Sequence, residues 1–309
     1  MNRPSFADAM ASRPIVLDGG LASRLEVRGN DVSSDLWSAA LLIERPDEIV
    51  AAHRDFFGAG ARVAITASYQ ASFEGLARIG LDRDAAAELM RTSVRLADQA
   101  RREAVPDDPA WIAVSVGPYG AVLADGSEYR GDYGLSVAEL RQWHRRRFEV
   151  LASTVGPAGP GDVLAIETIP CAAEAEAVLA ELDGTGVPAW LSLTCTDGRT
   201  RAGEDVATVF AMARDVDEIV AVGVNCCAAP EVADLLAVAV SASGKPGIAY
   251  PNSGEEWVAA TRSWRGAPTV IPGLVDDWLA AGAGAVGGCC RVGVDEISAV
   301  AGRVASRRR

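Results

Sequence analysis

The sequence predicts an α/β protein folded as a single (β/α)8 TIM barrel. Eight short apolar runs alternate with segments of helical pattern along its 309 residues. The interiors of these runs are almost continuously apolar, which is typical of parallel strands covered on both faces. Eight strand–helix pairs in one chain favour a closed barrel. An open doubly wound sheet is the alternative, but the first run is not followed by the GxGxxG motif expected there.

The eight apolar runs give the predicted strands, in chain order. They are Pro14–Asp18, Arg62–Ser68, Trp111–Gly117, Asp162–Thr168, Pro188–Thr194, Glu218–Cys226, Gly247–Asn252 and Gly284–Cys289.

Helices fit the intervals between these strands. Pro46–Gly58 begins at a proline and ends at a glycine, the usual asymmetry of helix ends, and Ser136–Thr154 begins with the Ser-x-x-Glu pattern of a capping box. The other predicted helices are Arg83–Glu103, Ala172–Leu182, Glu204–Arg214, Pro230–Ser241, Asp276–Ala281 and Asp295–Ala305. No linker divides the chain, so we expect one domain, residues 1–309, with its core at about residues 13–305.

Composition and charge narrow the function classes. The formal net charge is −13, from 29 basic and 42 acidic residues. Nucleic acid would be repelled by this charge, whereas a cationic small molecule would be compatible with it. No apolar run reaches the length of a membrane span, and Met1–Ser12 lacks the apolar stretch of a secretory signal. We therefore expect a cytoplasmic protein whose six cysteines are reduced.

Three cysteines stand at the ends of predicted strands, where a barrel carries its active site. Cys226 ends the sixth strand, and Cys289 and Cys290 end the eighth after a glycine pair that lets the backbone bend. Three thiolates hold a zinc ion and leave its fourth position open, as in a catalytic site. Alternation along the strand favours Cys226 over Cys227 as the inward residue. Cys171 and Cys195 lack metal spacing and are interpreted as structural.

Carboxylates also occupy strand ends. Glu167 ends an otherwise apolar strand, where an unpaired carboxylate is costly, so we expect a cationic partner such as a substrate ammonium. Asp18 precedes Gly19-Gly20 and is either a turn aspartate or part of the same site. His53 and His144 fall on outer helices and are interpreted as structural, which weakens a Ser/His hydrolase interpretation.

Seven motifs together resemble the homocysteine S-methyltransferases, in the correct order from about Ile15 to Val304. They are Leu17-Asp18-Gly19-Gly20, Leu36-Trp37-Ser38, Thr66-Ala67-Ser68-Tyr69-Gln70, Tyr129-Arg130-Gly131-Asp132-Tyr133, Glu167-Thr168-Ile169-Pro170, Gly223-Val224-Asn225-Cys226 and Gly287-Gly288-Cys289-Cys290. Of these motifs, Thr66–Gln70 and Tyr129–Tyr133 most resemble the branch of the family that uses S-methylmethionine.

The resemblance implies a zinc-dependent barrel with specific site residues. Zn²⁺ would be held by Cys226, Cys289 and Cys290, with the homocysteine sulfur at the fourth position. Asp18 and Glu167 would take the substrate ammonium, and Ser68 and Asn225 would serve the carboxylate or orient a ligand. Trp37 and Tyr133 resemble aromatic residues beside the donor pocket, where they would attract a cationic donor.

The implied reaction is methyl transfer from a sulfonium donor to the thiol of L-homocysteine, which gives methionine. S-methylmethionine is the first candidate donor, S-adenosylmethionine the second, and betaine the least favoured. One alternative is a zinc-binding or thiol redox-sensing barrel without methyl transfer, and another is a methyltransferase with a different thiol or selenol acceptor, such as selenohomocysteine. The expected partners are small molecules, not nucleic acid or membrane, and the sequence does not decide the oligomeric state.

Overall fold

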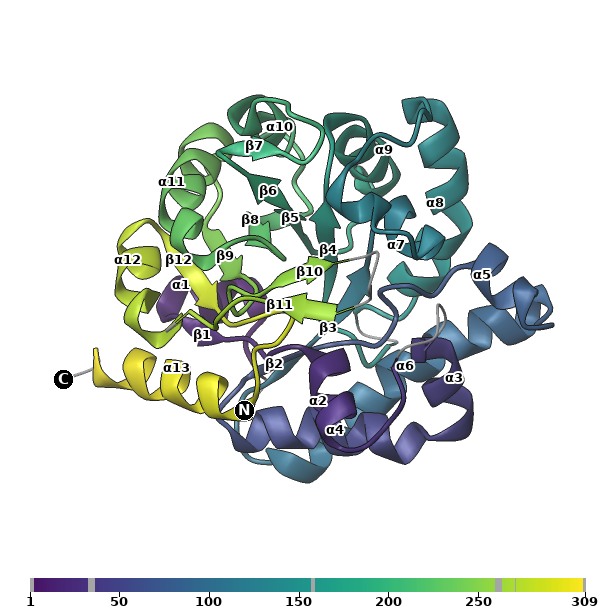
Figure 1. The fold of residues 1–309 in the computed structure, drawn as a ribbon, viewed down its shortest axis with the longest axis horizontal. Coiled ribbons are helices and arrows are strands. Elements are labelled where there is room, and N and C mark those ends of the chain that lie inside the picture. The colour runs from purple at the N-terminus through teal and green to yellow at the C-terminus, as the bar shows by residue number, and fades with distance from the viewer. Residues whose placement is uncertain (1–2, 33–36, 157–158, 259–262, 270, 308–309) are drawn as a thin grey trace.

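The strands of the computed structural model form a (β/α)8 barrel, as predicted. The structure describes residues 3–32, 37–156, 159–258, 263–269 and 271–307. Eight parallel strands follow one another in the order β1-β12-β9-β8-β5-β4-β3-β2, with helices on the outside (Figure 1). A parallel bridge between Leu17 and Val63 joins the two end strands, where the Arg62 amide donates to the Val16 carbonyl at 2.7 Å. This bridge closes the ring.

All eight predicted strands are confirmed, several of them shorter than expected. They are β1 (Ile15–Val16), β2 (Val63–Ile65), β3 (Trp111–Val116), β4 (Val163–Ile169), β5 (Ala189–Leu193), β8 (Ile219–Asn225), β9 (Gly247–Tyr250) and β12 (Ala283–Val286).

The eight predicted helices are present as well. They are α4 (Pro46–Gly58), α6 (Arg83–Ala104), α8 (Val137–Ala152), α9 (Ala172–Leu182), α10 (Val206–Ala211), α11 (Val232–Ser243), α12 (Val275–Ala280) and α13 (Val294–Ser306). The predicted capping box forms at the start of α8, where Ser136 and Glu139 each accept a hydrogen bond from the other's backbone amide. In the part of the chain that the structure describes, no helix is both long and apolar enough to span a bilayer.

Several short elements lie in connections where the sequence predicted no regular structure. They are α1 (Phe6–Ser12), α2 (Leu21–Val27), α3 (Trp37–Glu44), α5 (Phe73–Arg78), α7 (Tyr119–Leu123), the 3₁₀ helices η1 (Ser127–Tyr129), η2 (Ala229–Glu231) and η3 (Ile271–Gly273), and the hairpins β6–β7 (Cys195–Thr196, Arg199–Thr200) and β10–β11 (Glu256–Val258, Ser263–Arg265). Helices of five to eight residues are marginal by themselves, so tertiary packing decides whether they form.

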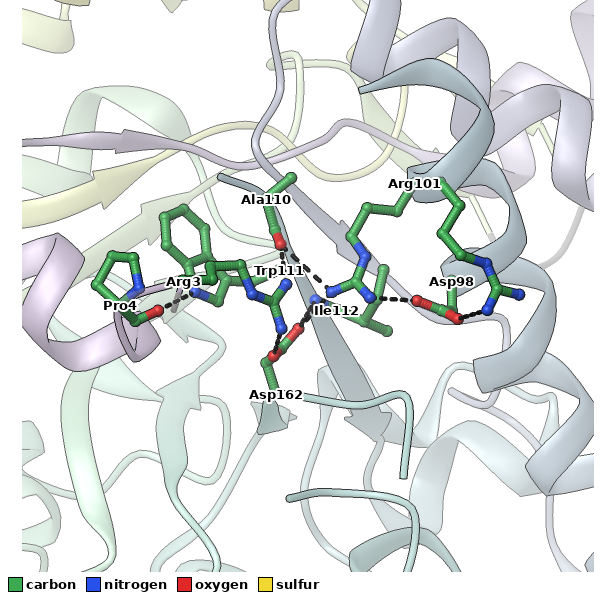
Figure 2. A network of polar contacts seen from close by, with 9 residues as sticks. Arg3, Pro4, Asp98, Arg101, Ala110, Trp111, Ile112 and Asp162 are labelled. Atoms are coloured by element: carbon green, nitrogen blue, oxygen red, sulfur yellow. Dashed lines mark hydrogen bonds and ion pairs between the residues drawn. The ribbon is translucent and has the colours of Figure 1, made fainter. Parts of the chain in front are cut away.

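The N-terminal segment covers the end of the barrel opposite to the strand carboxyl ends. Phe6 of α1 packs against Trp111 and Trp190, with ring centroids 6.2 and 5.6 Å apart. Figure 2 shows the polar contacts that fix this segment, in which Asp162 contacts the Arg3 guanidinium, accepts from the Ile112 amide at 2.8 Å and lies 3.2 Å from Arg101. Asp162 therefore ties three segments together at the start of β3 and β4.

Two apolar cores lie on either side of the strands. Inside the barrel, Trp111, Trp190 and Tyr250 are fully buried, and the Trp190 indole donates to the Tyr250 hydroxyl at 2.9 Å. Between the strands and the outer helices lies a larger aliphatic layer. Large side chains thus fill the barrel interior, and the space for a ligand lies above them, at the carboxyl ends of the strands.

Candidate metal centre and substrate site

A cavity of about 680 Å³ opens at the carboxyl ends of the barrel strands. This is the end at which barrels of this kind carry their active sites. Its walls come from the ends of β2, β4, β8 and β9 and from the segments that follow β1, β2, β3, β8, β9 and β12. Among the residues that line it are Gly19, Gly20, Thr66, Tyr69, Gln70, Glu128, Tyr129, Glu167, Thr168, Asn225, Cys226, Tyr250, Cys289 and Cys290.

Three thiols meet in this cavity. The Sγ atoms of Cys226 and Cys289 lie 2.7 Å apart, those of Cys289 and Cys290 lie 3.9 Å apart, and all three lie within 4.8 Å of one another. They come from the ends of β8 and β12, the two neighbours of β9. The neighbouring Cys227 instead packs into the layer between strands and helices. This arrangement has the residue types of a metal site.

The donor set can be tested against the geometry of a zinc ion. Zn–S bonds of about 2.3 Å in a tetrahedron separate the sulfur atoms by about 3.8 Å. The separation of 3.9 Å between Cys289 and Cys290 matches this value. Cys226 and Cys289, at 2.7 Å, lie about 1 Å too close, so their side chains would have to move apart around an ion. Three sulfur ligands with room for a fourth ligand fit such a centre.

Close packing explains the two glycines before the cysteine pair. A Cβ on Gly287 would lie 2.6 Å from the Leu17 Cβ, and one on Gly288 would lie 2.2 Å from a Val292 methyl group. Neither glycine has a positive φ, so close packing, and not a left-handed backbone, is the observed reason for glycine here. Their lack of a side chain lets β12 pass close to the segment after β1 and brings both cysteines to the mouth.

Asn225 holds two strained segments together. Thr168 and Cys226 both adopt left-handed backbone angles, with φ of 60° and 50°, which are unfavourable for residues other than glycine. The Asn225 side chain accepts from the Thr168 amide at 2.8 Å and the Ser192 hydroxyl at 2.8 Å, and donates to the Thr168 hydroxyl at 2.7 Å. Thr194 donates to the Cys226 carbonyl at 3.1 Å. These bonds fix the backbone that presents Cys226.

The thiols share protons unequally. The pKa of Cys290 is lowered well below its ordinary value, because its sulfur accepts hydrogen bonds from Cys226 and Cys289 and also from Tyr129. The pKa of Cys289 is raised, because its proton is held in bonds with Cys226 and Cys290. A bound cation would favour the deprotonated form of all three thiols.

Two buried carboxylates lack a cationic partner. Asp18 accepts from the Ile65 amide at 2.8 Å, but its other oxygen is buried without a hydrogen bond. Burial and the nearby Glu167 raise the pKa of Asp18 well above its usual value. Burial also raises the pKa of Glu167 to about 7, although the Ser115 hydroxyl donates to it. Neither carboxylate forms an ion pair within the described ranges, so a cationic ligand would complete the site.

The other predicted site residues differ in their positions. The Ser68 hydroxyl is buried and donates to the Ser115 carbonyl at 2.8 Å, so it faces the protein. Tyr133 packs against Tyr119, with ring centroids 5.3 Å apart, and is not among the residues that line the cavity. Trp37 begins α3, and its side chain lies outside the described residues. The geometry therefore brings Asp18, Glu167, Asn225 and the three cysteines together, but not Tyr133.

Sequence reasoning missed Glu128 and Tyr129, which line the cavity from η1, eleven or more residues beyond the end of β3. It also missed Arg147 of α8, which is fully buried and donates to the carbonyls of Gly117 and Tyr69, both at 2.7 Å. Arg147 follows two arginines, which suggests a solvated run of charge. Its spacing of three from His144 and four from Leu151 is the signal that places it on the buried face.

Comparisons with known proteins identify the family. Residues 15–304 match the family model for homocysteine S-methyltransferase. The chain is 42% identical to homocysteine S-methyltransferase 4 of Zea mays, over 93% of this chain and 88% of the maize protein. It is 41% identical to the Escherichia coli homocysteine S-methyltransferase, over 94% of each. The crystal structure of the metallated E. coli homocysteine methyltransferase MmuM matches with a TM-score of 0.83 and 38% identity, covering 94% of this chain and 96% of that one.

Proposed function

Since the chain belongs to the homocysteine S-methyltransferase family, we propose that it transfers a methyl group from a sulfonium donor to the thiol of L-homocysteine at a zinc centre. The observation that carries this proposal is the meeting of three thiols within 4.8 Å in a cavity that Glu167 also lines, with the buried carboxylate of Asp18 close to Glu167. The product is methionine. Cys226, Cys289 and Cys290 are the proposed ligands.

Zinc is the metal that this donor set favours. Sulfur ligands suit zinc, and three protein ligands leave one coordination position for a substrate. When bound, zinc would remove the proton of a coordinated thiol and keep the sulfur nucleophilic at neutral pH. Because a site of this kind needs reduced cysteines, we propose that the protein acts in the cytoplasm.

Asp18 and Glu167 are the proposed partners of the homocysteine ammonium. The buried, unbonded oxygen of Asp18 offers an acceptor, and Glu167 lines the cavity beside it. An ammonium between them would offset their mutual repulsion and restore both pKa values toward their usual range. The amino acid would then be oriented with its thiol toward the cysteines, which brings sulfur and methyl donor together in a fixed geometry.

The site does not require a general acid. A sulfonium donor leaves as a neutral thioether, so no proton has to be supplied to it. The residues described as lining the cavity include no histidine, and both His53 and His144 are buried in outer helices. This fits methyl transfer better than hydrolysis.

Ser68 and Asn225 are proposed to support substrate binding indirectly, by positioning the segments that line the cavity. Their side chains are used within the protein, and they hold the segments after β2 and β8 against their neighbours. For the donor, Trp37 remains the proposed aromatic contact. Tyr129 lines the cavity and Tyr133 does not, so we propose Tyr129 as the second aromatic contact.

The test is a donor panel with zinc-loaded protein and homocysteine, in which methionine is measured with S-methylmethionine, S-adenosylmethionine and betaine. We expect stoichiometric zinc and the fastest reaction with S-methylmethionine. Cys226→Ser should lose both zinc and activity, whereas the matched control Cys227→Ser, which changes the outward neighbour, should keep both. Zinc bound without methionine from any donor would instead favour a zinc-binding or redox-sensing protein.

A further inference from the structure

The cavity contains a carboxylate that the proposed reaction does not use. Glu128 lies in η1, and its side chain lines the cavity. Its Oε2 atom is buried and accepts no hydrogen bond. The nearest cation in sequence, Arg130, instead lies 3.3 Å from Asp132 and 3.6 Å from Asp125. Glu128 is therefore an acidic group inside the cavity without an ion pair among the described residues.

A second unused acceptor lies near the same helix. The Gln70 amide nitrogen donates to the Ala121 carbonyl at 3.2 Å, while its oxygen is buried without a partner. The adjacent Gly120 packs so closely on η1 that an added Cβ would lie 2.5 Å from the Glu128 nitrogen. Residues 120–121 of α7 thus contact both Gln70 and the Glu128 backbone. An ammonium, with three donors and no acceptor, complements two unpaired acceptors.

The position of η1 relates these acceptors to the thiols. Tyr129 follows Glu128 and lines the same cavity. Cys226, Cys289 and Cys290 line it as well. A molecule bound at Glu128 therefore shares the cavity with the metal-binding sulfurs. Asp18 follows β1 and Glu167 lies near the end of β4, and Glu167 raises the pKa of Asp18, so these two form a separate pair of carboxylates.

We propose that Glu128, assisted by Gln70, binds the ammonium group of the methyl donor and thereby selects a sulfonium that is itself an amino acid. This inference rests on the proposed function. The acceptor amino acid uses Asp18 and Glu167, and the donor amino acid uses Glu128. Burial raises the pKa of Glu128 to about 7, and a cationic ligand would stabilise its ionised form.

The test compares two donors that differ only in the amino group. S-methylmethionine carries an ammonium, and 4-(dimethylsulfonio)butanoate is the same molecule without it. For Glu128→Gln, we expect kcat/KM for S-methylmethionine to fall roughly 10- to 100-fold, the size of a lost charged hydrogen bond. The value for the butanoate analogue should change by less than about threefold, and so should the KM for homocysteine, since neither depends on the donor ammonium.

Asp132→Asn is the matched control, because it removes a carboxylate from the same motif at an exposed position paired with Arg130. Asp132→Asn should leave kcat/KM unchanged for both donors. Zinc content and thermal unfolding of Glu128→Gln should equal those of the wild type, which excludes a folding defect. Equal losses of kcat/KM with both donors, or a change confined to the KM for homocysteine, would overturn the assignment of Glu128 to the donor ammonium. If the wild-type protein formed no methionine from any sulfonium donor, S-adenosylmethionine included, the proposed function itself would have failed.

Discussion

Replacing Asn225 with alanine should destabilise the protein and loosen the metal centre. The Asn225 side chain makes three hydrogen bonds of 2.7–2.8 Å, two to Thr168 and one to Ser192. All three residues are buried, with exposed fractions of 0–1%. Asn225→Ala therefore leaves the Thr168 amide and the Ser192 hydroxyl without an acceptor in the interior.

The expected loss can be derived from these contacts. A buried donor left unpaired costs about 1–3 kcal/mol, so two of them cost about 2–6 kcal/mol. The left-handed backbone of Thr168 and Cys226 adds strain that Asn225 now opposes. We expect a free energy of unfolding lower by about 3–4 kcal/mol. Because Cys226 follows Asn225 directly, its sulfur should also hold zinc at least about tenfold less tightly.

The assay is urea unfolding followed by circular dichroism, together with zinc competition against a chelator. Thr168→Val serves as the matched comparison, because it removes the bond from the Asn225 amide nitrogen, keeps both bonds to the Asn225 oxygen, and should cost about 1 kcal/mol. Stability of Asn225→Ala within about 1 kcal/mol of the wild type would refute the reasoning. A raised KM for homocysteine with stability and zinc affinity unchanged would instead make Asn225 a direct substrate contact.

Two further predictions concern titratable groups. Glu167→Gln should raise the KM for homocysteine about 10- to 100-fold while zinc stays bound. Since the pKa of Glu167 is about 7, the wild-type KM for homocysteine should rise as the pH falls below 7 and the carboxylate becomes protonated. If the KM of Glu167→Gln depended on pH as that of the wild type does, the ammonium role would be contradicted. Burial lowers the pKa of His53 to about 4 from 6.5. The unfolded chain therefore binds a proton near pH 6.5, whereas the folded protein takes it up only near pH 4. Because of this difference, about 3 kcal/mol of the stability that is present above pH 6.5 should be lost as the pH falls to 4. His53→Leu should remove this loss in urea unfolding compared between pH 7.5 and pH 4.5, and an unchanged pH dependence would show that other groups cause it.

The barrel could be predicted because its strands carry their own signal. Val163–Ile169 and Ile219–Asn225 are buried along almost their whole length, and the sequence shows them as apolar runs. The short helices carried no comparable signal. Phe6–Ser12 forms because Phe6 packs on Trp111 and Trp190, residues more than a hundred positions away, and such contacts are not visible in a local pattern.

The same distinction explains which site residues were found. In a parallel barrel every strand delivers its carboxyl end to one mouth, so Asp18, Glu167 and Cys226 are brought together by the strand register alone. Glu128 belongs to a connection whose path depends on Gly120 fitting against η1. Arg147 lies on an outer helix and donates hydrogen bonds to the carbonyls of Gly117 and Tyr69.

The difference between site residues at strand ends and site residues in connections also indicates which part of the site can change the choice of donor. The thiols and the proposed acceptor carboxylates lie at or just beyond the ends of strands β1, β4, β8 and β12, which pair in one barrel sheet. The donor-side groups Glu128 and Tyr129 lie on a connection held by α7 and by the stacking of Arg201, whose guanidinium carbon lies 5.3 Å from the centre of the Tyr129 ring. A change in this connection can alter the donor pocket without disturbing the metal ligands. The part of donor selectivity that Glu128 and Tyr129 provide should therefore depend on residues 119–133, and acceptor binding should depend on the strand ends.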